Sequence, residues 1–112
     1  MDEEKKRVQI ENKRLTKKIY TALEKVEDPE LGIDIVNLGL INEINLYEEA
    51  FVEVKMTLTT MGCPFADQIQ EDIRQAVVNL DEVNQVEVKL VWYPAWTPER
   101  MSRYARIALG VR

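Results

Sequence analysis

Histidine is absent from this 112-residue chain, and cysteine occurs only once, at Cys63. Without histidine the chain cannot build a Ser-His-Asp or Cys-His catalytic arrangement, and it lacks the imidazole ligands on which most zinc sites depend. A single cysteine cannot form an internal disulfide bond, which suits a reducing compartment. Cys63 is therefore the one thiol that this chain offers for soft-metal or sulfur chemistry.

Long apolar runs are absent as well. No uninterrupted run approaches the ~20 residues that span a bilayer, and the start, Met-Asp-Glu-Glu-Lys-Lys-Arg, lacks the apolar stretch of a signal peptide. The formal net charge of -5 disfavours nucleic acid, whose phosphates need a basic surface. We therefore expect a cytoplasmic protein whose partners are other proteins, with no nucleic acid and no membrane among them.

The residues that are present fit one globular domain. With 46% hydrophobic residues the chain is large enough to fold around a single core, and no repeat, low-complexity tract or linker divides it. We expect one domain over residues 1–112. Residues 1–11 are rich in charges and are expected to form a frayed N-terminal extension.

The first predicted element is a helix that starts at about Asn12. Its apolar residues recur at spacings of three and four, which places them on one stripe of a helix. Asp28-Pro29 then ends the helical region, because the residue before a proline avoids the helical backbone conformation. The stripe consists of Leu15, Ile19, Ala22, Leu23 and Val26.

Two strands are predicted next. The run from Leu40 to Leu46 alternates along the chain and stops at Glu48-Glu49. In the run 52–59 the even-numbered residues are apolar and the odd-numbered ones polar, which predicts a strand with one buried face. So short a polar turn should join the two strands as an antiparallel hairpin.

A helix, a third strand and a final helix complete the prediction. Pro64 is expected at the first position of a helix of about four turns. Residues 86–92 alternate again, and a crossover helix makes this strand parallel to the previous one. Thr97 should cap a last helix that begins at Pro98 and ends at Gly110. The fold class is therefore α+β, a single small sandwich in the order helix, strand, strand, helix, strand, helix.

This connectivity brings three loops, 28–39, 59–64 and 93–97, to one edge of the predicted sheet. Ligand sites commonly lie beyond the carboxyl ends of strands that crossover helices connect. Cys63 should stand at the cap of its helix, where free N–H groups and the helix dipole favour a thiolate. The segment 59–64, Thr-Thr-Met-Gly-Cys-Pro, is therefore the candidate functional site.

Each of these residues also has a purely structural interpretation. Cys63 can be a small apolar filler, and the Asp-Pro-Glu segment at 28–30 can be an ordinary turn rather than a source of carboxylates for a metal or for proton transfer. The threonines at 59–60 are common in strands. Of the two tryptophans, Trp92 is predicted in the core, and Trp96, in a loop between two prolines, is predicted to line a pocket.

Four segments together make the chain recognisable. They are Asp28-Pro29-Glu30, the run Gly-Ile-Asp-Ile-Val-Asn-Leu-Gly-Leu-Ile at 32–41, the segment 59–64, and Trp92-Tyr93-Pro94-Ala95-Trp96. As a set they resemble the MIP18-like (DUF59) iron-sulfur cluster assembly domain family, and most of all its stand-alone bacterial SufT-type proteins. The likeness covers about residues 12–110. It implies a fold related to the carboxy-terminal domain of NifU-type scaffolds and a role in maturing iron-sulfur proteins.

The resemblance also implies roles for particular residues. It makes Cys63 the reactive cysteine and a transient metal ligand, with no catalytic residue in the usual sense and no permanent cofactor. The positions that support Cys63 in the predicted site are Asp28, Glu30, Asp34, Thr59, Thr60, Pro64 and Trp96.

The leading hypothesis is an accessory factor in iron-sulfur cluster assembly that docks onto scaffold and client proteins. Cys63 would transiently handle iron, sulfur or a cluster, because soft thiolates suit that cargo. One thiolate cannot satisfy a cluster that needs four cysteines, so a bound cluster requires a second subunit, a partner or a small thiol. A homodimer is one arrangement that the sequence leaves open.

Two other hypotheses stay open. The first is a non-catalytic adaptor with an inert thiol, or a PaaD-like subunit that serves a metabolic oxygenase complex. The chain stops at Arg112 without the cysteine-rich tail of PaaD, which favours the SufT-like interpretation. The second is a thiol enzyme, whose base would have to be Asp28, Glu30 or Asp34, and carboxylates activate a thiol poorly at neutral pH.

Overall fold

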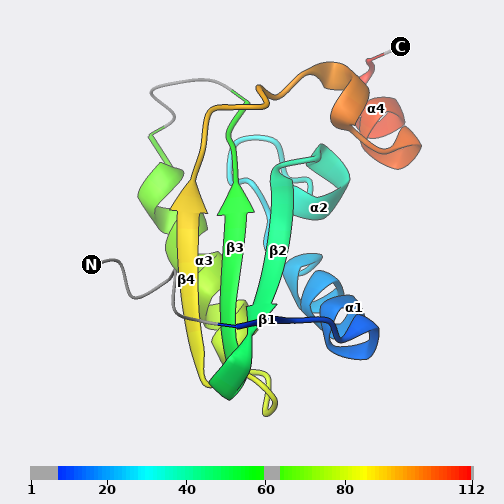
Figure 1. Cartoon of the computed structure of the whole chain (residues 1–112). Coiled ribbons are helices and arrows are strands. Elements are labelled where there is room, and N and C mark those ends of the chain that lie inside the picture. The colour runs from blue at the N-terminus through cyan, green and yellow to red at the C-terminus, as the bar shows by residue number, and fades with distance from the viewer. Residues whose placement is uncertain (1–7, 60–63, 112) are drawn as a thin grey trace.

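The computed structural model describes residues 8–59 and 64–111. Four strands form one sheet in the order β1-β2-β3-β4 (Figure 1). They are β1 (Gln9–Ile10), β2 (Ile41–Tyr47), β3 (Phe51–Met56) and β4 (Gln85–Leu90). The helices are α1 (Lys13–Leu23), α2 (Ile35–Leu38), α3 (Ala66–Val78) and α4 (Arg103–Leu109), with 3-10 turns at Glu48–Ala50 and Pro98–Arg100.

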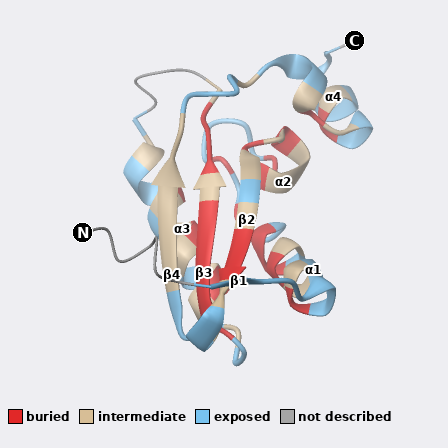
Figure 2. Cartoon of the chain, in the orientation of Figure 1, coloured by how far each residue is buried: buried red, intermediate tan, exposed pale blue. Residues whose placement is uncertain are grey.

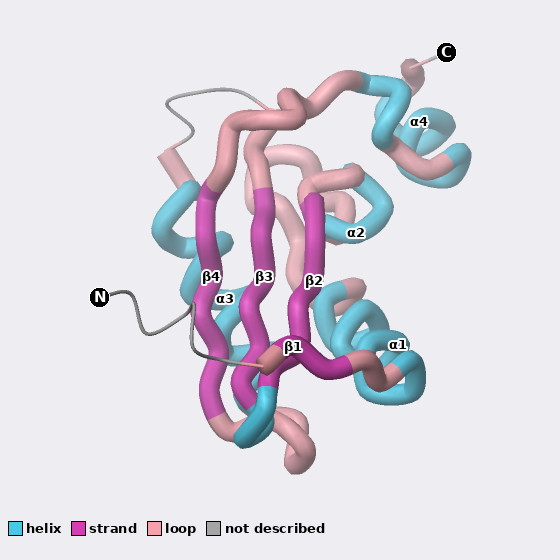
Figure 3. Tube along the Cα trace, in the orientation of Figure 1, coloured by secondary structure: helices cyan, strands magenta, loops and turns pink. Residues whose placement is uncertain are grey.

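The predicted fold class is confirmed. Strand β2 pairs with β3 antiparallel, and β3 pairs with β4 in parallel, with α3 as the crossover between them. Two elements were not predicted: the short strand β1, which pairs antiparallel with the end of β2, and the short helix α2, which lies in the predicted loop 28–39. Strand β1 corrects the expectation that residues 1–11 are frayed throughout, because Gln9 and Ile10 are paired in the sheet. Figure 3 shows β1 at the end of β2 that is opposite to α2.

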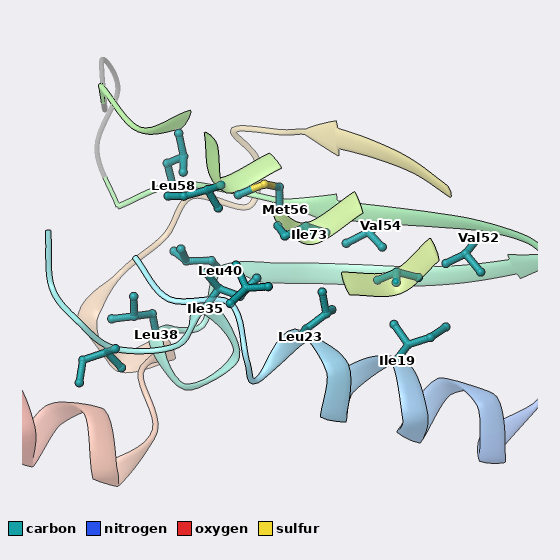
Figure 4. Close-up of a cluster of buried hydrophobic side chains, with 14 of the residues drawn as sticks. Ile19, Leu23, Ile35, Leu38, Leu40, Val52, Val54, Met56, Leu58 and Ile73 are labelled. Carbon is teal, nitrogen blue, oxygen red and sulfur yellow. The ribbon is translucent and has the colours of Figure 1, made fainter. Parts of the chain in front are cut away.

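The core lies between the sheet and the helices α1, α2 and α3. Figure 4 shows Ile19 and Leu23 of α1 facing Val52 and Val54 of β3. All five residues of the first predicted stripe are buried, and Asn12 caps α1 by accepting a hydrogen bond from the Leu15 N–H (3.0 Å). The helix ends at Leu23, well before the predicted stop at Asp28-Pro29.

The prediction that only one face of β3 is buried is wrong. Five of its six residues are buried (Figure 2), including Glu53, which is 4% exposed. A polar cluster on the other face explains this burial: Asn45 donates to the Glu53 carboxylate (2.9 Å), and Lys89 forms an ion pair with it (3.0 Å). Gln9 of β1 donates in turn to Asn45 (2.9 Å), so this cluster links all four strands.

The start of α3 lies later in the chain than predicted. Its cap residue is Phe65 and its first helical residue is Ala66, so Pro64 lies in the preceding turn and not at the first helical position. Phe65 packs against the core, which holds the chain in a turn before the helix begins. The prediction that Cys63 caps this helix is therefore wrong, because the cap residue is Phe65. Cys63 itself lies outside the described residues.

The predicted last helix is divided into two pieces. Pro98–Arg100 form a 3-10 turn, Met101 is extended (φ -70°, ψ 145°), and Ser102 caps α4 by accepting from the Ala105 N–H (3.1 Å). Met101 is buried in the core, and the Ser102 N–H donates to the Asn37 carbonyl (2.8 Å). These tertiary contacts outweigh the local preference for one continuous helix. The second piece, α4, ends at Gly110 as predicted.

Candidate functional site at the loop edge

Two of the three predicted loops meet at one edge of the sheet. The Trp96 Nε1–H donates to the Leu38 carbonyl (2.6 Å), and the Arg100 guanidinium donates to the Asn42 side-chain oxygen. Figure 1 shows the chain after β4 passing the ends of β3 and β2 on its way to α4. We call this region, residues 28–42, 57–59, 64 and 91–100, the loop edge.

The end of β3 is held on both sides at the loop edge. The Thr57 N–H donates to the Leu40 carbonyl (2.8 Å), and the Met56 carbonyl accepts from the Val91 N–H (2.8 Å). Thr59 follows this fixed backbone closely in the chain, and Pro64 lies in the turn before α3. Thr60 and Cys63 lie outside the described residues, so their predicted place in the site stays a prediction.

Only one of the two tryptophans differs from its predicted position. Trp92 was predicted in the core, but β4 ends at Leu90, and the Trp92 side chain is 44% exposed. Trp96 is half-buried, packs against the core and donates the hydrogen bond to Leu38. Trp96 therefore holds the loop 93–97 against the loop 28–39 at the loop edge.

Asp28 is held in a turn of the backbone. It is buried, and its Oδ1 accepts hydrogen bonds from the N–H groups of Glu30 (2.8 Å) and Leu31 (3.3 Å). Its own carbonyl accepts from the Gly32 N–H (2.8 Å), which closes the turn. This geometry favours the interpretation of segment 28–30 as an ordinary turn, which the Asp28 carboxylate stabilises, over a source of carboxylates for a metal or for proton transfer.

Asp34 caps α2. Its two carboxylate oxygens accept from the backbone N–H (2.9 Å) and the side-chain amide (2.6 Å) of Asn37. Glu30, by contrast, is exposed. Among the described residues no group of three or more His, Cys, Asp or Glu side chains is placed to hold a metal ion. The carboxylates at 28 and 34 thus shape the backbone of the loop edge.

Sequence reasoning missed three residues of this edge. Asn42 and Arg100 join the two loops, and Thr57 is buried there. The Asn42 Nδ2 and the Thr57 Oγ1 are buried without a hydrogen-bond partner among the described residues. A signal for Asn42 was available, since the alternation of the first predicted strand breaks at this position, where the pairing of β2 with β3 shifts register between Ile41 and Glu43.

Replacing Trp96 with phenylalanine should lower the free energy of unfolding by about 1 kcal/mol, because it removes one hydrogen bond and leaves the Leu38 carbonyl unpaired. Urea unfolding followed by circular dichroism measures this change. The matched control is Trp92→Phe, at an exposed position, which should change the free energy of unfolding by less than about 0.5 kcal/mol. Equal effects of the two substitutions would contradict the role given to Trp96.

The fold and the loop edge define the class of protein: a small α+β domain with a mixed sheet and one thiol in the segment that follows its central strand. A family described as iron-sulfur cluster assembly protein matches residues 16–90. The chain belongs to this family, which confirms the resemblance read from the sequence. No helix in the described ranges is long and apolar enough to cross a membrane.

Proteins of nearly the same length support this membership. The chain is 50% identical over 98 residues to the Fe-S protein maturation auxiliary factor YitW of Bacillus subtilis, covering 88% of this chain and 96% of YitW. It is 52% identical over 86 residues to the Fe-S protein maturation auxiliary factor SufT of Staphylococcus aureus, covering 77% and 98%. A DUF59 domain from Bacillus anthracis has a similar crystal structure, with a TM-score of 0.84, 48% identity, and coverage of 89% and 95%.

Proposed function

We propose that this protein is an auxiliary factor in the maturation of iron-sulfur proteins. The observation that carries the proposal is its match, along almost their whole length, to two proteins that are named as such factors. Auxiliary factors act on other proteins, so we place its partners among iron-sulfur scaffolds and client proteins. We further propose that the chain is not an enzyme, because it offers no histidine to activate its thiol.

In this proposal Cys63 handles the cargo, which is iron, sulfur or a cluster, and the contact is transient. A cluster commonly needs four cysteine thiolates, and this chain supplies one. The carboxylates of Asp28 and Asp34 are engaged in a turn and a helix cap, which argues against their use as further ligands. The missing ligands would come from a partner, a small thiol or a second copy in a homodimer, and a reducing cytoplasm would keep the thiol available.

The supporting residues then act by positioning the backbone around Cys63. Asp28 and Asp34 shape the segment 28–38, and Trp96 holds it against the chain that follows β4. We assign Glu30, Thr59, Thr60 and Pro64 to the same site as neighbours of these segments in the chain.

Replacing Cys63 with serine should abolish the support of iron-sulfur enzymes while leaving the fold intact, because serine keeps the size of the side chain and removes the soft ligand. The measurement is the activity of several iron-sulfur enzymes under iron limitation, in cells whose own gene is replaced by the variant. Thermal unfolding of the purified variant should match that of the unmodified protein.

A matched control returns one thiol to the chain at a distant exposed position. Ala108 of α4 is exposed, so the double variant Cys63→Ser, Ala108→Cys restores the thiol count without restoring its place. This double variant should remain inactive. Full complementation by Cys63→Ser alone would contradict the proposed role of the thiol. It would favour the adaptor hypothesis, in which the loop edge only docks other proteins.

A further inference from the structure

Helix α1 collects positive charge on a chain whose net charge is -5. Its sequence, KRLTKKIYTAL, contains four cations and no acidic residue, and Lys25 follows shortly after the helix ends. Lys13 and Arg14 lie in the first helical turn, where the helix dipole disfavours cations. Helix stability therefore does not explain why cations occupy the first turn of α1. Several of the cations, Arg14, Lys17, Lys18 and Lys25, line a groove.

The groove runs beside α1 and reaches the residues that follow α3. It has a volume of about 440 Å³ and is lined by Ala22 and Leu80, which are apolar, and by a surrounding set of polar side chains, Arg14, Lys17, Lys18, Thr21 and Lys25. We call it the basic groove. Helices α1 and α3 pack against each other, so its two walls belong to one rigid part of the fold.

One cation of the basic groove is paired. Lys18 forms an ion pair with Glu82, and this hydrogen bond lowers the pKa of the Glu82 carboxyl. Arg14, Lys17 and Lys25 form no ion pair with any residue in the described ranges 8–59 and 64–111. Arg14 makes no such pair, but its positive charge also helps to lower the pKa of the Glu82 carboxyl. Three positive charges that form no ion pair among the described residues thus surround a surface that contains apolar atoms.

We propose that the basic groove docks an acidic segment of a partner protein that also carries apolar side chains. Carboxylates of the segment would pair with Arg14, Lys17 and Lys25, and an apolar side chain would contact Leu80 and Ala22. Charged groups at such a rim mainly raise the association rate and the specificity of docking. None of these residues belongs to the loop edge, so the groove and the loop edge can be occupied together.

The same features disfavour the other polyanions. A nucleic acid is disfavoured because its phosphates gain nothing from the apolar side chains of Leu80 and Ala22. A membrane-surface helix needs an exposed apolar face, but Leu15, Ile19 and Leu23 of α1 are buried in the core. A short acidic segment is favoured because at physiological salt each charge acts over only ~8 Å, so the local cations outweigh the distant acids.

The test is direct binding of a fluorescent peptide of alternating glutamate and leucine, followed by fluorescence anisotropy. The triple variant Arg14→Gln, Lys17→Gln, Lys25→Gln should bind the peptide at least about tenfold more weakly than the unmodified protein. The matched control removes the same amount of charge elsewhere, through Lys55→Gln, Arg103→Gln and Arg106→Gln. It should change the affinity less than about twofold, because these cations lie outside the groove.

Three results would overturn the proposal: no binding to the unmodified protein at millimolar peptide, an equal loss in the control variant, or tighter binding of single-stranded DNA or anionic vesicles than of the peptide. The Cys63→Ser variant should bind the peptide as the unmodified protein does. Peptide binding needs neither iron nor the thiol. A failure to bind the peptide would therefore leave the proposed maturation role intact, and a failure of the Cys63 prediction would leave the proposed docking groove intact.

Discussion

Replacing Gly39 with alanine is expected to lower the free energy of unfolding by about 3 kcal/mol. Gly39 ends α2 with φ +79°, a left-handed conformation that costs a residue with a Cβ about 1–2 kcal/mol. A Cβ at this position would also lie 2.4 Å from the Arg100 carbonyl oxygen. Because that atom belongs to the backbone, the contact can be relieved only by moving the two loops apart.

Gly32→Ala is the matched control for this prediction. Gly32 has nearly the same backbone conformation, with φ +69°, but no atom lies within 4 Å of an added Cβ. Its replacement should therefore cost only the conformational part, about 1 kcal/mol. Urea unfolding of both variants measures the difference, which isolates the contact with Arg100. Equal losses in the two variants would show that Gly39 matters for its conformation alone.

The contact at Gly39 also matters for the candidate site. Arg100 approaches Gly39 through its backbone and donates to Asn42 through its guanidinium, close to the hydrogen bond between Trp96 and Leu38. The Gly39→Ala variant should therefore loosen the loop edge in its native state. A shift of the tryptophan fluorescence of the folded variant to longer wavelength is the expected sign.

The elements that the sequence predicted correctly are those with a long local pattern. The stripe of α1, the alternation of β2, β3 and β4, and the crossover helix α3 each repeat over several residues, so the periodicity alone indicates the element. The parallel pairing of β3 with β4 followed from the crossover. The overall α+β class was predictable for this reason.

The elements that the sequence did not predict are short or depend on contacts between distant residues. Helix α2 has four residues, too few for a helical period, although both of its caps, Asp34 and Gly39, were readable. The break at Met101 and the burial of Glu53 depend on partners far along the chain. Local propensity cannot indicate such contacts, because they arise only when the sheet is assembled.

The candidate site shows the same division. The sequence identified the three segments of the loop edge by connectivity, and the structure brings 28–39 and 93–97 together as expected. The sequence could not show whether Asp28 binds a metal or stabilises a turn, because both roles use the same residue types. The hydrogen bonds from Glu30 and Leu31 favour the turn.

Replacing Ile35 with alanine should be as damaging as the change at Gly39, for a different reason. Ile35 lies in the segment that the sequence predicted as a loop, yet its side chain is 0% exposed, and Figure 4 shows it beside Leu40 in the core. Truncating a buried isoleucine removes its transfer free energy and leaves a cavity, which together cost about 3 kcal/mol. That loss is a large fraction of the stability of a small domain, and urea unfolding measures it.

Ile107→Ala is the matched control, since Ile107 lies on α4 and is 69% exposed. It should change the free energy of unfolding by less than about 0.5 kcal/mol. The pair therefore compares the same chemical change in a predicted loop and in a predicted helix, with the larger effect expected in the loop. A loss below about 1 kcal/mol for Ile35→Ala would mean that α2 is a surface loop, as the sequence suggested, and that the loop edge is not anchored in the core.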